Sequence, residues 1–536
     1  MDNSRAVYGI DLGTTYSCIS QVDKYDQAVV LRNFEGDATT PSAVYFDPDD
    51  DSKVVVGKEA KGMLATEPQN TVVFVKRSMG NDADFDKSCN RFPHHYDPSE
   101  ISAFILKKLV QDANALGDNP EPINDVVITC PAYFGTKERM QTKQAGISAG
   151  LNVLAIINEP TAAAISYGVK LDERKTILVY DLGGGTFDVT IITVDKGAIK
   201  VVATGGDPHL GGYDWDKALS KYMLTAFNAE NNTSYSFDDD TILQNSLMLE
   251  AEMKKKNLTA KDTTKWNFSY EGKNTRLTLS RDDFEAITES LLDETIDKTR
   301  EVLDIARQKG YGKPDMFLLV GGSSRMPQVK ARVDREFGCD ALFHDPDECV
   351  AKGAAIFAMN EAYTKAIRDY EEGEIDEKPK PITGDRTTVR NVTSKTYGML
   401  VNVRQSDDTY KLMTENVIFA NTQLPTSFTT TGSLINDNQD YLPIDLYESD
   451  YTDPVANELV EPDTCRDIDH QQLKLTKNYP KGEPVKNVLS VNDEGILSVS
   501  VTVGVDRIDF QLHITGVKTE QELILSKSRV MSKTIE

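Results

Sequence analysis

The chain has 536 residues, which suggests three or four structural units, and 39% hydrophobic with 27% charged residues is typical of a folded soluble protein. Its formal net charge of −26 disfavours electrostatic binding to nucleic acid or to an anionic membrane. No apolar run approaches the roughly 18 residues of a membrane-spanning helix, and the first residues lack the apolar core of a secretory signal. Six cysteines without a Cys-x-x-Cys pair and only six histidines argue against a zinc site or a disulfide framework, and favour a reducing, cytoplasmic setting.

A pattern near the start of the chain is repeated later. Residues 7–15 read as an apolar strand that ends in Asp, followed by a Gly/Thr turn, and a second strand is expected at 17–22. Residues 178–186 repeat the strand, the Asp and the Gly/Thr turn before another strand at 188–194. This duplication predicts two related lobes that face each other.

Strands and helices are expected to alternate around these two hairpins. The hydrophobic patterns predict strands at 125–131, 152–157 and 317–320, and helices at 136–149, 161–169 and 280–307. Such alternation is typical of an α/β domain. Cys18 and Cys130 lie in apolar strand patterns and are expected to be buried thiols.

The character of the sequence changes after about residue 368. Residues 369–377 carry six acidic residues and are followed by Lys-Pro-Lys-Pro, which predicts a solvated linker, or else the frayed end of a helix. Beyond Asn391 the helical pattern stops, and short alternating strands predict an antiparallel β domain that ends near Gly516. The last twenty residues could form one short helix or a tail.

The two hairpins suggest phosphate chemistry. Glycines let the backbone approach phosphate oxygens closely, the threonines add hydroxyl donors, and Asp11 could hold a hydrated divalent cation. One such hairpin is usually only a turn, but two that face each other could grip a polyphosphate from both sides. A third element, residues 319–327, runs from a strand into Gly321 and Gly322, where a flat base could approach and Arg325 could stack on it, although an ordinary strand-to-helix turn would look the same.

Together with residues 127–134, 158–168 and 207–212, these elements resemble the seventy-kilodalton heat-shock (DnaK-type) chaperone family. The resemblance implies an α/β, two-lobed actin-like ATPase domain with a ribonuclease H-like duplication, followed by an antiparallel β-sandwich. The implied domains are an ATPase domain at 1–362 (lobes at about 1–171 plus 345–362, and 172–344), a linker at 363–390, a β substrate-binding-like domain at 391–516 and a tail at 517–536.

The resemblance also implies site residues and cofactors, namely ATP or ADP with Mg²⁺, and K⁺ as a further candidate ion. The expected catalytic residues are Asp11, Lys76, Glu159, Asp181, Thr186 and Asp188, of which Asp11, Glu159 and Asp181 would hold the metal mainly through water. The expected nucleotide contacts are Gly13, Thr14, Thr15, Tyr16, Gly183, Gly184, Gly185, Gly212, Glu252, Lys255, Lys256, Gly321, Gly322, Ser323, Arg325 and Asp347. Val417, Phe419 and Leu442 match the family's peptide groove, although they could equally be core residues.

Four departures from the family pattern stand out. Tyr213 replaces a Glu. The family's apolar linker, which docks when ATP is bound, is replaced by the polar residues 385–390, whose arginines would be costly to bury. Ala155 replaces an Arg used by J-domain partners, and Asn391 replaces an Asp. No helical lid follows the β domain, which would be natural or the result of truncation.

The main hypothesis is an ATP-hydrolysing chaperone that binds unfolded polypeptide. The alternative is a nucleotide-bound scaffold or exchange-factor-like relative that hydrolyses little. A J-domain protein and a nucleotide exchange factor are doubtful partners, and neither nucleic acid nor a membrane is expected. Because the altered linker should not dock, ATP is expected to change peptide affinity by less than about fivefold.

Overall fold

The computed structural model describes residues 6–81, 96–116, 122–168, 174–195, 198–238, 240–375, 377–379, 388–493, 495–512 and 517–536. Outside these residues lie Cys89, one of the six cysteines, Arg386, one of the two arginines in the polar linker segment 385–390, and Gly516, the expected end of the β domain. Cys18 and Cys130 are buried as predicted, and burial raises the pKa of both thiols. No helix in these ranges is both long and apolar enough to cross a membrane.

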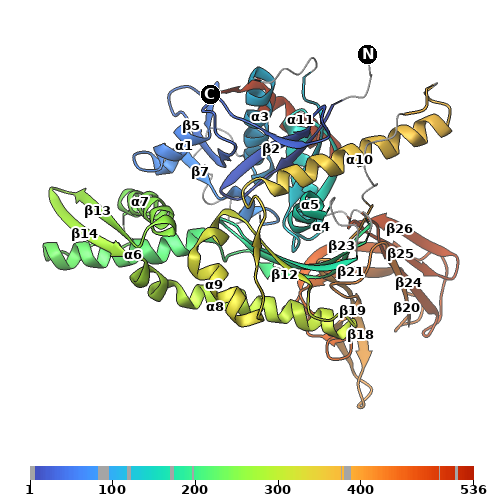
Figure 1. The fold of residues 1–536 in the computed structure, drawn as a ribbon. Helices are drawn as coiled ribbons and strands as arrows, with labels where there is room; N and C mark the ends of the chain where they lie inside the picture. The colour runs from blue at the N-terminus through green and yellow to red at the C-terminus, as the bar shows by residue number, and fades with distance from the viewer. Residues whose placement is uncertain are drawn as a thin grey trace.

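The first lobe is built on a mixed sheet in the order β3-β2-β1-β8-β9, with β4 paired to β2. Helices α3, α4 and α5 flank this sheet, and a smaller sheet of β5, β6 and β7 adjoins it (Figure 1). The strands are β1 (Val7–Asp11), β2 (Tyr16–Val22), β3 (Ala28–Leu31), β4 (Thr40–Pro41), β5 (Ala43–Phe46), β6 (Lys53–Val56), β7 (Thr71–Val73), β8 (Asp125–Cys130) and β9 (Asn152–Asn158). The helices are α1 (Lys58–Met63), η1 (Pro68–Asn70), η2 (Val75–Ser78), α3 (Pro98–Leu116), α4 (Thr136–Ser148) and α5 (Glu159–Gly168).

The second lobe repeats the plan of the first, because its sheet runs in the order β16-β15-β10-β11-β12-β17. In both lobes an antiparallel hairpin (β1–β2, β10–β11) pairs in parallel with a later strand (β8, β15), which confirms the predicted duplication. The strands are β10 (Lys175–Leu182), β11 (Phe187–Asp195), β12 (Ala198–Asp207), β13 (Thr263–Tyr270), β14 (Lys273–Ser280), β15 (Met316–Val320) and β16 (Leu342–Phe343). The helices are α6 (Gly212–Asn231), α7 (Thr241–Ala260), α8 (Arg281–Gln308), η3 (Gly322–Arg325) and α9 (Pro327–Phe337).

Helix α10 (Cys349–Glu371) returns to the first lobe and packs unusually closely on it. A Cβ on Gly353 would lie 1.7 Å from the carbonyl oxygen of Ala162, and one on Gly9 would lie 2.1 Å from the amide of Ala355. Only glycine allows helix α10 to approach α5 and β1 so closely. The helix continues to Glu371, so the segment expected as linker begins as helix.

The β domain consists of two antiparallel sheets that enclose one core, as predicted. Their orders are β22-β19-β18-β21-β23 and β20-β24-β25-β26. The strands are β18 (Thr396–Arg404), β19 (Tyr410–Ile418), β20 (Thr426–Ser433), β21 (Tyr441–Ser449), β22 (Leu459–Val460), β23 (Arg466–Lys474), β24 (Pro484–Val491), β25 (Leu497–Val503) and β26 (Asp506–Gln511), with η4 at Pro462–Thr464. Pro443 is tolerated in β21 because at that position the strand pairs only with β23.

The last residues of the linker, 388–390, are docked, contrary to the expectation from the polar sequence. Strand β17 (Thr388–Arg390) adds in parallel to the edge of the second lobe's sheet, where Val389 lies opposite Ile199 of β12. Val389 packs against buried apolar residues, whereas Arg390 stays exposed. The prediction was wrong because strand addition uses the backbone, so that docking does not require the Arg390 side chain to be buried.

The β domain contacts both lobes directly. On the first lobe, Arg466 pairs with Glu138 at 3.0 Å and donates to the carbonyl of Gly80 at 2.7 Å. On the second, the Thr204 amide donates to Asn421 Oδ1 at 2.7 Å, and Lys309 donates to the carbonyl of Asn421 at 2.6 Å. The β domain therefore bridges the two lobes.

The segment 517–536 forms a helix rather than a free tail. Helix α11 (Glu520–Ser532) packs on α4 and α3 of the first lobe, and strand β27 (Thr534–Ile535) pairs in parallel with β6. In Figure 1 the end of the chain lies near β5, well away from the β domain.

Candidate functional site

The two Asp/Gly/Thr hairpins meet across a cavity of about 600 Å³ between the lobes. A Cβ on Gly184 would lie 1.9 Å from Thr15 Oγ1, and one on Gly185 would lie 2.2 Å from Thr14 Cγ2. The glycines are therefore needed for the two turns to approach one another. Their backbone amides and the threonine hydroxyls surround a space suited to phosphate groups.

The floor of the cavity concentrates buried charge. Asp181 and Glu159 are 8% and 7% exposed, Asp11 is half-buried, and Asp188, outside the cavity lining, is 1% exposed. Lys76 lies among these carboxylates and is ion-paired with Glu159. Burial, followed by repulsion from Glu159, raises the pKa of Asp11 to about 7 and of Asp188 to about 8, and the same causes raise the pKa of Asp181 well above its ordinary value. Burial alone would lower the pKa of Lys76, but Glu159 and Asp11 outweigh it, so that the pKa is raised and the ammonium stays charged.

This donor set fits a hydrated divalent cation. Four carboxylates face one ammonium, so positive charge is in deficit and a cation would relieve the repulsion that raises their pKa values. No three carboxylate, imidazole or thiol groups within the described residues are arranged to chelate an ion directly. Mg²⁺ commonly keeps several of its waters, and Asp11, Glu159 and Asp181 are the residues that would hold those waters.

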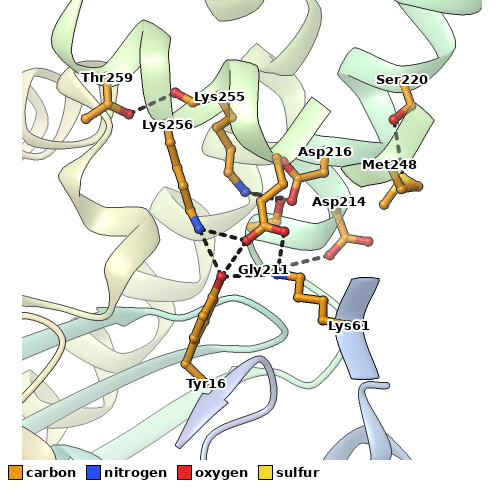
Figure 2. Close-up of polar contacts among 12 residues, drawn as sticks. Tyr16, Lys61, Gly211, Asp214, Asp216, Ser220, Met248, Lys255, Lys256 and Thr259 are labelled. Carbon is orange, nitrogen blue, oxygen red and sulfur yellow. Dashed lines mark hydrogen bonds and ion pairs between the residues drawn. The ribbon is translucent and has the colours of Figure 1, made fainter. Parts of the chain in front are cut away.

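The opposite end of the cavity is formed by one face of α7. Glu252, Lys255 and Lys256 are spaced so that they project from the same side of this helix. Glu252 accepts from the Tyr16 hydroxyl at 3.0 Å and pairs with Lys61 at 2.5 Å, and both of these partners come from the first lobe (Figure 2). Lys255 donates to Asp216 and to the carbonyl of Gly212. The contacts of Glu252 therefore join the two lobes at the α7 end of the cavity, whereas those of Lys255 lie within the second lobe.

The third predicted element also reaches the cavity. Gly321 has a positive φ of 80°, and a Cβ there would lie 2.4 Å from Asp181 Oδ1, so the strand-to-helix turn packs directly against the second hairpin. Arg325 and Asp347, expected near the base, pair with one another at 2.6 Å and are both about half exposed. They are free to close over a flat ligand, since neither is fixed by burial.

Most of the predicted nucleotide residues line this one cavity. Among the expected catalytic and nucleotide-contacting residues, only Gly185 and Asp188 are outside its lining; Asp188 is 1% exposed and accepts from the Ala132 amide at 3.0 Å. The expected groove residues lie in the β domain, where Val417 and Leu442 pack against the core.

Two lining residues, Phe74 and Lys61, and the neighbouring Arg77 were not predicted from the sequence. Phe74, which has a left-handed backbone with φ of 58°, packs edge-on against Tyr213 at 4.6 Å between ring centres, so the residue noted as a departure forms an aromatic contact between the lobes. Arg77 lies over the Tyr213 ring and donates to the carbonyl of Gly185 at 2.7 Å. Lys61 had no signal in the sequence, because a lysine in a short helix is normally a surface residue.

The family comparison agrees with this geometry. A family model described as "Hsp70 protein" matches residues 7–370. The chain belongs to the Hsp70 family. This match covers both lobes and almost all of α10, and it confirms the predicted fold of an actin-like ATPase domain followed by a β-rich region. Hsp70 proteins are chaperones that bind ATP and in general hydrolyse it. The cavity between the two hairpins is therefore the candidate nucleotide site, on the grounds of both family membership and geometry.

Proposed function

We propose that this Hsp70 protein binds magnesium-ATP between its lobes, hydrolyses it slowly and acts as a chaperone in the cytoplasm. The observation that carries the proposal is the single cavity into which both hairpins, Lys76 and α7 project. A polyphosphate needs hydrogen-bond donors on several sides and charge compensation, and this cavity offers both.

Each part of the cavity has a role in this proposal. The amides of both turns, with Thr14, Thr15 and Thr186, would bind the phosphates. Asp11, Glu159 and Asp181 would hold magnesium through its waters, and the ion would supply charge neutralisation for the phosphates. Lys76, held by Glu159 at the cavity floor, would stabilise negative charge that develops on the γ-phosphoryl group.

The base and ribose would lie at the other end. Glu252, Lys255 and Lys256 offer polar groups from α7, and Ser323 and Arg325 face them from the turn after β15. The Lys61–Glu252 pair and the Tyr16–Glu252 hydrogen bond lie over this end, so nucleotide release would require the lobes to part.

The β domain would bind extended polypeptide. Leu412, Phe428 and Tyr441, on three of its strands, are 45–51% exposed, which leaves apolar surface available for a partner. Val417 and Leu442 would support this surface from the core. J-domain proteins and exchange factors act on the family in general and are proposed here only as candidates.

A second candidate function is a nucleotide-bound scaffold that turns over little ATP. It is favoured by the docking of β17 on the second lobe and of the β domain on both lobes, because these contacts hold the β domain against the lobes. In this case nucleotide would complete the fold rather than drive a cycle.

Single-turnover hydrolysis separates the two candidates. Radiolabelled ATP is mixed with excess protein, alone and with an unfolded peptide and a J-domain protein. Product formation that is lost in Lys76→Ala, but kept in the exposed control Lys58→Ala, supports hydrolysis. Tight magnesium-dependent binding with no product under any condition supports the scaffold.

A further inference from the structure

The segment 517–536 is tightly built into the first lobe. On α11, Ser526 and Val530 are fully buried, and Ser526 shares a hydrogen bond of 2.9 Å with Ser148 of α4. On the outer side of the same helix, Ile524 and Leu525 are 64% and 63% exposed. One defined face of α11 therefore belongs to the lobe's core.

Backbone pairing extends this attachment beyond the helix. Strand β27 lies beside β6, where the Thr534 amide donates to Ser52 at 2.9 Å and the Val56 amide donates to Glu536 at 3.0 Å. Ile535 is 4% exposed and joins the same apolar core as Val530. The segment thus adds a strand to a sheet as well as a helix to a helical layer.

Charged groups complete the junction. Lys107 of α3 donates to the carbonyls of Val530 and Lys533, at 3.2 and 2.6 Å, and so satisfies the end of α11. Lys533 pairs with Asp51 at 2.9 Å, and Arg529 pairs with the buried Glu100 at 2.5 Å. The two residues of each pair are far apart in the sequence, so these contacts form only when the C-terminal segment packs on the first lobe.

The two ends of the β domain are consequently tied to different lobes. Its first end follows β17, which is part of the second lobe's sheet, and its other end leads into α11, which is part of the first lobe. If the β domain undocks while α11 stays in place, β17 and the contacts of the β domain with the lobes must break, but the C-terminal end of the domain remains attached to the first lobe. This attachment keeps the effective concentration of the β domain near the lobes high, which favours rebinding.

We propose that residues 517–536, hereafter the clasp, hold the β domain docked on the lobes whether or not nucleotide is bound. A ligand shifts a conformational equilibrium only by its differential affinity for the two states. With the undocked state made rare by the clasp, ATP and ADP act on nearly the same docked molecule. The expectation that ATP and ADP have similar effects rests on the proposed nucleotide binding, whereas the docking of the β domain by the clasp does not.

Hydrogen exchange on the nucleotide-free full chain tests the docking. Val530→Asp places a charge in the core beneath α11, and Leu525→Asp places the same charge on its exposed face as the matched control. We expect Val530→Asp to speed exchange of the amides of β17 at least tenfold, with α8 unchanged as the internal control for folding. Exchange at β17 that stays within twofold of wild type, in a variant whose α11 amides have become exposed, would overturn the proposal.

A charge swap covers the case in which Val530→Asp does not fold. Lys533→Glu should speed exchange at β17, and adding Asp51→Lys should restore it, because Asp51 is 54% exposed and tolerates either charge. If Lys533→Glu releases α11 but leaves amide exchange at β17 unchanged, the clasp proposal is contradicted.

Fluorescent-peptide affinity with ATP and with ADP tests the consequence. Less than a fivefold difference is expected for the wild type, and a tenfold or larger difference for Val530→Asp. A wild-type difference of tenfold or more would overturn the proposal. If neither protein binds nucleotide at all, the proposed function fails, while the exchange experiment still decides the clasp.

Discussion

Replacing Gly184 by alanine should separate the two hairpins. The added Cβ would lie 1.9 Å from Thr15 Oγ1 and 2.7 Å from Thr15 Cβ. Rotation of the Thr15 side chain can move the hydroxyl but not the Cβ, so a turn must shift by about 1 Å to reach ordinary contact distance. Because misplacement of about 1 Å at a binding or catalytic site costs on the order of 100-fold, we expect ATP affinity to fall by about that factor.

Gly312→Ala is the control for this experiment, because Gly312 is outside the cavity lining. A Cβ on Gly312 would have no atom within 4 Å, and its backbone is not left-handed. Calorimetry with magnesium-ATP should therefore show near wild-type affinity for Gly312→Ala and a large loss for Gly184→Ala, with thermal unfolding confirming that both variants fold. Equal affinities in the two variants would refute the argument that the hairpins must touch.

Three further predictions follow from the site and from the domain interface. Lys76→Ala should keep ATP affinity within about tenfold while single-turnover hydrolysis falls about 100-fold, as for loss of one preorganised charge; unchanged turnover would remove Lys76 from its role. Lys61→Ala breaks the partly buried pair with Glu252 and should speed release of a fluorescent nucleotide about fivefold, equivalent to about 1 kcal/mol, whereas Lys58→Ala should not. Burial, then repulsion from Glu138, raises the pKa of Glu448 from 4.5 to about 7, so the folded protein binds a proton that the unfolded chain has released. The free energy of unfolding should therefore fall as pH rises between these values, and Glu448→Gln should flatten that part of the profile; an unchanged slope in urea unfolding would contradict this.

The elements that the sequence predicted well are those with a local cause. The pattern of each hairpin, an apolar strand followed by an Asp and a glycine turn, lies within a short continuous stretch of sequence. In the structure both hairpins are paired as predicted. Lys76 and Glu159 could be assigned because their flanking residues resemble a known family. The structure brings these two together, although they are far apart in the chain.

The contacts that escaped prediction depend on tertiary structure. The prediction that the linker would not dock rested on the cost of burying the arginine side chains of 385–390. In the structure β17 joins β12 through its backbone, which does not require that burial. The role of 517–536 could not be read from its short amphipathic pattern, since the surface that it covers comes from α3, α4 and β6. The contact of Tyr16 with Glu252 likewise exists only once the lobes face each other.

Photolabelling with 8-azido-ATP tests the central claim most directly. If the nucleotide binds between the lobes with its base at the α7 end, the label should appear on peptides from residues 241–260 or 321–347 and should disappear when magnesium-ATP competes. A label that maps to another surface, or that magnesium-ATP does not displace, would contradict the proposed site.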